Sequence, residues 1–173
     1  MIVFDANIWI AKFDPLVERT LPPDPNTGEV ITHVKVRIEA LLGDAKQNRT
    51  TVLIPTPVLS EILVYTEARR YDLIELISQS AYLKIGDFDQ KSAIELAEMN
   101  IEVAKAVKDY RTEEPYQKSK LDRQIVAIAK ANSCSKLYTT DRGLKNFAER
   151  VGLDVRHLAD IPIPDSARQA DLF

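Results

Sequence analysis

Short apolar runs alternate with segments of helical periodicity along this chain, and that alternation constrains its fold most. Residues 1–4, 52–54, 82–85 and 137–139 have the apolar, β-branched and aromatic composition of buried strands, and residues 155–158 could add a last edge strand. Residues 34–45, 58–65, 93–107 and 121–131 place apolar side chains at the spacing of an amphipathic helix. Strands that alternate with helices build a parallel sheet covered by helices. We therefore predict an α/β sandwich around a central, mainly parallel sheet.

Composition excludes several classes of protein. The chain has 173 residues, of which 45% are hydrophobic and 28% charged, as in a single globular domain. It contains neither a P-loop nor a dinucleotide-binding glycine motif. No apolar run approaches the roughly 20 residues that span a bilayer. The single cysteine, Cys134, cannot form an internal disulfide. We expect a cytoplasmic protein with no membrane partner.

Prolines and charged residues mark the predicted loops. Residues 14–28 hold four prolines and are predicted to form a surface loop. Residues 108–120 are polar and interrupted by Pro115, so we predict a loop that places Asp122 in the first turn of the next helix. Pro162, Pro164 and polar residues follow the last predicted strand, which predicts a domain over residues 1–158 and an extended tail over 159–173.

Four acidic residues occupy positions where an α/β sheet binds ligands. Asp5 and Asp141 follow apolar runs, Glu61 lies in a helix just after a strand, and Asp122 lies near a helix start. Each alone could be a turn or capping residue. Together they would repel, since two carboxylates ~4 Å apart interact by roughly 4 kcal/mol at an effective dielectric of 20. A cation would relieve that repulsion, and oxygen ligands favour Mg²⁺ or Mn²⁺.

The segments around these acids resemble the PIN-domain nucleases. They read IVFDAN (2–7), PVLSE (57–61), LDRQIVAIA (121–129) and LYTTD (137–141), in the order found in that family, and the likeness to the small VapC-type ribonucleases of toxin–antitoxin systems covers roughly residues 1–158. The resemblance implies a PIN-like α/β/α fold. It also implies that the four acids are the catalytic and metal-binding residues, with Asn7 and Thr140 as supporting neighbours. The insertion at 14–28 and the tail depart from the small toxins.

The resemblance implies an endoribonuclease that uses Mg²⁺ or Mn²⁺ to hydrolyse phosphodiester bonds of RNA, and that could be a toxin with an antitoxin protein as partner. The net charge of −3 requires that any nucleic-acid contact come from a local basic patch. Lys120, Arg123 and Arg142 flank the proposed acids and are our candidates for phosphate contacts. A homodimer is also expected, through the apolar helix face of Leu59, Ile62 and Leu63.

Three alternatives remain open from the residues. The same site could cut single-stranded or branched DNA. The Asp5-Ala6-Asn7 sequence loosely resembles the opening of haloacid-dehalogenase-like phosphatases, but Asn7 replaces that family's second aspartate. A catalytically silent nucleic-acid-binding module is the third alternative.

The last five residues carry a separate motif. The sequence QADLF (169–173) resembles the motif with which bacterial replication and repair proteins dock on the sliding clamp. Leu172 and Phe173 would be the apolar anchors, and Gln169 would add a hydrogen bond. We expect the tail to bind the clamp with modest affinity, because a flexible segment loses conformational entropy when it binds.

Overall fold

The computed structural model describes residues 1–106, 116–165 and 167 of the chain. Its centre is a five-stranded sheet in the order β3-β2-β1-β4-β5, and every neighbouring pair is parallel. The strands are β1 (Ile2–Phe4), β2 (Val52–Pro55), β3 (Leu83–Gly86), β4 (Lys136–Tyr138) and β5 (Asp154–Arg156). This confirms the predicted α/β class, with a sheet that is parallel throughout.

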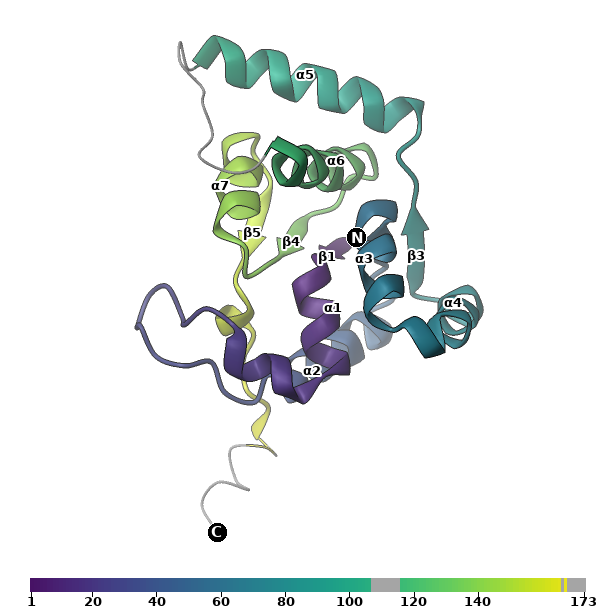
Figure 1. The fold of residues 1–173 in the computed structure, drawn as a ribbon, viewed down its shortest axis with the longest axis vertical. Coiled ribbons are helices and arrows are strands. Elements are labelled where there is room, and N and C mark those ends of the chain that lie inside the picture. Colours follow the sequence, from purple (N-terminus) through teal and green to yellow (C-terminus); the bar gives the residue numbers. More distant parts are fainter. Residues whose placement is uncertain (107–115, 166, 168–173) are drawn as a thin grey trace.

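Helices cover the sheet on both sides. They are α1 (Ala6–Phe13), α2 (Val34–Gln47), α3 (Thr56–Tyr65), α4 (Arg70–Gln79), α5 (Gln90–Ala106), α6 (Tyr116–Ala131) and α7 (Arg142–Arg150), with 3-10 turns η1 (Pro15–Thr20), η2 (Glu67–Arg69) and η3 (Leu158–Asp160). Figure 1 shows α5, α6 and α7 toward the top of the view, and α1 and α2 on the other side. The arrangement is an α/β/α sandwich.

The inner strands β1 and β2 are apolar at every position because both of their faces are covered. All of their residues are buried, as expected for parallel strands enclosed between helices. The register pairs Ile2 with Val52 on one side of β1, and Phe4 with Tyr138 on the other. The residues that follow β1 and β4 therefore leave the sheet side by side at one edge.

Two predicted loops contain helical structure. Residues 15–20 of the predicted surface loop form η1. Helix α6 begins at Tyr116, inside the predicted loop 108–120, so Asp122 lies in the second turn of the helix and not in the first. Lys and Gln are good helix formers, and they extend the helix although the segment is polar. The rest of that predicted loop lies outside the described residues.

The compact body extends past the predicted boundary at residue 158. Strand β5 ends at Arg156, and η3 follows it. Ile161 is buried, and the guanidinium of Arg37 donates to the carbonyl oxygens of Ala159 and Ile161. The tail residues Gln169, Leu172 and Phe173 lie outside the described residues, so clamp docking stays a prediction.

The face predicted for self-association is largely part of the core. Ile62 is only 1% exposed, and Leu59 packs against the same core. The strongly exposed apolar side chains nearby are Val64 and, on α4, Tyr71 and Leu76. A helix long and apolar enough to cross a membrane is not found in the described part of the chain.

The surroundings of Gly86 show that α6 packs tightly on the sheet. A Cβ at this position would lie 2.8 Å from Cγ2 of Ile128 and 3.1 Å from both Cδ atoms of Leu53. Both neighbours are fully buried, so Gly86→Ala should lower the free energy of unfolding by about 1–3 kcal/mol. Gly43→Ala is the matched control, because Gly43 lies inside α2 with open space around it. This variant should raise the free energy of unfolding by up to about 1 kcal/mol. Urea unfolding of both variants measures the difference, and equal effects would contradict the packing described here.

Candidate active site

Asp5 connects strand β1 to helix α1. Its backbone N–H donates to the carbonyl of Tyr138, which extends the pairing of β1 with β4 by one residue. Its side chain then caps α1, with Oδ1 accepting from the N–H of Ala6 at 2.7 Å. Capping by an aspartate satisfies a backbone donor that the first turn leaves without a helical partner. The cap holds the carboxyl in the interior, where Asp5 is only 6% exposed.

Asp141 repeats this arrangement after β4. It caps α7, and its Oδ1 accepts from the backbone N–H groups of Gly143 at 2.7 Å and Leu144 at 3.0 Å. Since β4 lies directly beside β1, the two capping aspartates occupy neighbouring positions at the carboxyl edge of the sheet. The same local arrangement therefore occurs twice in the chain: a buried strand is followed by an aspartate that caps the next helix.

Thr139 links the two aspartates. Its hydroxyl donates to Oδ2 of Asp5 at 2.8 Å and accepts from the backbone N–H of Asp141 at 2.9 Å. Thr139 is also buried. The sequence motifs point to Thr140 as the supporting threonine and not to Thr139, whose place beside Asp5 follows from the strand register, because Phe4 pairs with Tyr138 one residue earlier. The Asn7 amide also reaches Asp5, donating to Oδ2 at 3.4 Å.

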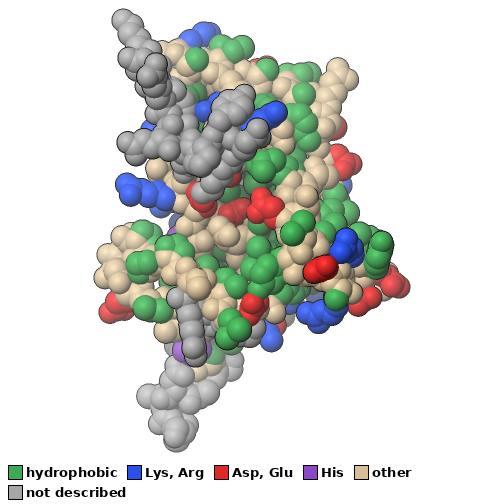
Figure 2. All heavy atoms as spheres, viewed as in Figure 1, with side chains coloured by type: hydrophobic (Ala, Val, Ile, Leu, Met, Phe, Trp, Pro, Cys, Tyr) green, Lys and Arg blue, Asp and Glu red, His purple; other side chains and the backbone are tan. Residues whose placement is uncertain are grey.

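Glu61 comes from α3, which follows β2 on the other side of β1. It is exposed, and α3 packs against both α1 and α6. Its negative charge and that of Asp141 act on Asp5, and both raise the pKa of that carboxyl. Figure 2 shows acidic side chains gathered in the middle of this face, between the positions of α1 and α6 in Figure 1.

Burial has the largest effect on Asp5. It raises the pKa of the Asp5 carboxyl from its usual 3.8 to about 6, against the opposing hydrogen bonds from Thr139 and Ala6. A carboxylate in such surroundings is costly to keep ionised, because it has lost water and faces two further negative charges. A cation bound here would compensate that charge.

Asp122 lies on α6, where its Oδ2 is a buried atom. Asp5 lies close enough to Glu61 and Asp141 for their negative charges to act on its carboxyl, after the larger effect of burial. Asp122 stays a prediction as the fourth member.

The donor set fits a hard cation. Among the residues that the structure describes, no three His, Cys, Asp or Glu side chains are grouped so that they could hold a metal ion together. Mg²⁺ does not need such a group, since it keeps several waters and is usually held by one or two carboxylates with substrate phosphates. A buried carboxyl with an elevated pKa and two acidic neighbours is consistent with that mode of binding.

The three cationic candidates have different surroundings. Lys120 on α6 and Arg142 at the start of α7 are exposed. Arg123 is partly buried; its guanidinium donates to the Asn100 side chain at 3.0 Å and lies 5.3 Å from the ring centroid of Phe147. These contacts join α6 to α5 and α7, and they give Arg123 a role in helix packing.

Comparison with known proteins identifies the fold. No family model and no curated protein sequence matches the chain. Among solved structures, the chain is similar to VapBC2 from Rickettsia felis bound to a DNA fragment from their promoter, with a TM-score of 0.58 and 20% sequence identity. The match covers 91% of this chain and 98% of the other. The fold is therefore a PIN-like α/β/α sandwich, as the sequence motifs implied.

The raised pKa of Asp5 has a consequence for stability. The folded state holds the Asp5 proton more tightly than the unfolded state does, so the contribution of Asp5 to stability is fully present below about pH 4 and is lost as the pH rises through about 6. In the metal-free protein, the ionised carboxyl should cost on the order of 3 kcal/mol at pH 7. Asp5→Asn should remove that pH dependence, because the amide keeps an oxygen acceptor for the α1 cap and carries no charge.

Urea unfolding of both proteins in EDTA between about pH 4 and 7 measures this difference. The variant should gain stability relative to the original chain as the pH rises. In a parallel series without EDTA, Mg²⁺ should stabilise only the original chain. Parallel pH curves for the two proteins would show that the Asp5 carboxyl is not destabilised by its surroundings.

Proposed function

We propose that the protein is a Mg²⁺- or Mn²⁺-dependent endoribonuclease. The observation that carries this proposal is the buried Asp5 carboxyl, coupled to Glu61 and Asp141 at the carboxyl edge of a parallel sheet. Ligands of open α/β sheets bind at that edge. The PIN-like fold and the motifs around the acids support the same reaction class.

In this proposal Asp5 and one acidic neighbour, Glu61 or Asp141, hold the cation together with waters and a substrate phosphate, and Asp122 is the predicted fourth acid. The bound ion would lower the pKa of an attacking water and stabilise negative charge on the phosphoryl oxygens. Thr139 keeps the Asp5 carboxyl and the Asp141 backbone in fixed positions through its two hydrogen bonds. Arg142, exposed one residue after Asp141, can bind a phosphate of the substrate strand.

We also propose a second protein as inhibitor, in the manner of a toxin–antitoxin pair. The similar VapBC2 structure supports this, together with the resemblance of the motifs to VapC-type toxins. An inhibitor could place an Arg or Lys beside Asp5 and compensate the same negative charge that a metal ion would compensate.

Asp141→Asn tests the catalytic proposal. Asparagine caps helices as well as aspartate does, so α7 should stay folded while the site loses one negative charge. Cleavage of a short single-stranded RNA in Mg²⁺ or Mn²⁺ should fall by at least ~10²-fold. Asp44→Asn is the control, since Asp44 is exposed on α2, and its rate should stay within about twofold of the original rate.

The same assay separates the alternatives. Cleavage of single-stranded DNA but not RNA would favour the DNA nuclease, and strand binding without cleavage would favour a silent binding module. Full RNA cleavage by Asp141→Asn, or equal cleavage in EDTA, would refute the proposed mechanism.

A further inference from the structure

The inserted segment between η1 and α2 forms one wall of a pocket beside Asp141. The pocket has a volume of about 350 Å³, and we call it the α7 pocket. Pro22, Pro23 and Pro25 line it on one side, and Arg142, Lys145 and Asn146 of α7 line it on the other. Asp141 itself belongs to the lining, so the pocket is continuous with the acidic site.

The proline wall is held in place by a hydrogen-bonded turn. The backbone N–H of Asp24 donates to the carbonyl of Glu29 at 2.9 Å, and that of Gly28 donates to the carbonyl of Asp24 at 2.8 Å. The Asp24 side chain accepts from the N–H of Asn26 at 2.8 Å, and Gly28 supplies the positive φ of 74° that the turn requires. Proline also restricts its own backbone. The wall is therefore preorganised.

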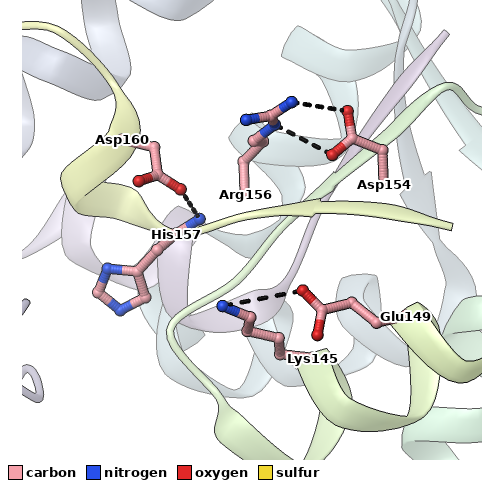
Figure 3. A network of polar contacts seen from close by, with 6 residues as sticks. All are labelled: Lys145, Glu149, Asp154, Arg156, His157 and Asp160. Atoms are coloured by element: carbon pink, nitrogen blue, oxygen red, sulfur yellow. Dashed lines mark hydrogen bonds and ion pairs between the residues drawn. The ribbon is translucent and has the colours of Figure 1, made fainter. Parts of the chain in front are cut away.

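The opposite wall carries positive charge on a chain whose net charge is −3. Arg142 is exposed, and the amine of Lys145 lies 3.8 Å from the Glu149 carboxylate in a half-exposed pair. Pairs of this kind contribute little free energy, so a phosphate can compete for the amine. Figure 3 shows this pair close to His157, whose ring points away from the Arg156–Asp154 pair. His157 also lines the pocket.

These walls match the parts of a nucleotide. The exposed prolines Pro22, Pro23 and Pro25 offer apolar surface against which a base can pack. The Asn146 amide can donate to and accept from a base edge. Arg142 and Lys145 suit a phosphate, and the volume lies in the usual range for small-ligand pockets.

We propose that the α7 pocket binds one unstacked nucleotide of the single-stranded RNA substrate, adjacent to the phosphate that is cut. This inference rests on the proposed nuclease function and adds a specificity-determining subsite to it. The walls come from the 14–28 insertion and α7, so the subsite distinguishes this chain from PIN-like proteins without the insertion. A base in a double-stranded nucleic acid would have to leave its base pair to enter this pocket, whereas a base of a single strand is free to do so.

Binding in EDTA tests the subsite apart from catalysis. The probe is a fluorescein-labelled single-stranded RNA of about eight random nucleotides, followed by fluorescence anisotropy across a range of salt concentrations. Lys145→Gln should weaken binding about tenfold and lower the salt dependence by roughly 0.7 in the slope of log Kd against log salt, the loss of one phosphate contact. Asn146→Ala should weaken binding by a similar factor with an unchanged slope. Lys35→Gln, an exposed lysine on α2, is the control and should match the original chain.

The two proposals fail in different ways. If both pocket variants bind RNA with the affinity and salt dependence of the unmodified chain, and metal-dependent RNA cleavage is intact, the subsite proposal is wrong. The proposed nuclease function would not be affected by that result. Equal pocket-dependent binding of the matching DNA strand would overturn the assignment to RNA. An original chain that neither binds nor cuts RNA would overturn the nuclease, and the subsite with it.

Discussion

The site depends on one buried carboxyl group that the fold holds in an unfavourable environment. Asp5 must stay where it is because its Oδ1 caps α1 and its Oδ2 accepts from Thr139. Burial and the charges of Glu61 and Asp141 then raise its pKa. These hydrogen bonds oppose part of the electrostatic cost without removing it. Such an arrangement favours binding of a cation, because the positive charge of the ion would stabilise the ionised carboxylate that burial and the neighbouring acids destabilise.

The parallel sheet explains how residues far apart in sequence reach this point. Strand β1 is central, with β2 on one side and β4 on the other, and all three strands run in the same direction. Each strand therefore delivers the start of its following helix to one edge. Asp5 and Asp141 are the N-caps of α1 and α7, and Glu61 lies in the second turn of α3. The same edge also borders the α7 pocket, so binding and chemistry share one face.

Much of this could be predicted from the sequence because it follows from local patterns. The alternation of strands and helices was sufficient for the fold class, and the position of Asp5 and Asp141 after apolar runs was sufficient to nominate both. Asp122 was placed wrongly within its helix, because a polar segment of good helix formers looks like a loop when Pro115 precedes it. Burial of Ile62 and the pocket walls at Pro23 and Lys145 depend on tertiary contacts between distant segments, which no local pattern reports.

The most direct test of the metal site is a crystal of the full chain soaked in Mn²⁺ and measured for anomalous scattering. An anomalous peak within coordinating distance of the Asp5 carboxylate, shared with Glu61 or Asp141, is the predicted result, and it should vanish in Asp5→Asn. A saturating soak with no peak at Asp5, or a peak bound only by acids elsewhere on the surface, would contradict the assignment of this buried carboxyl as the centre of the active site.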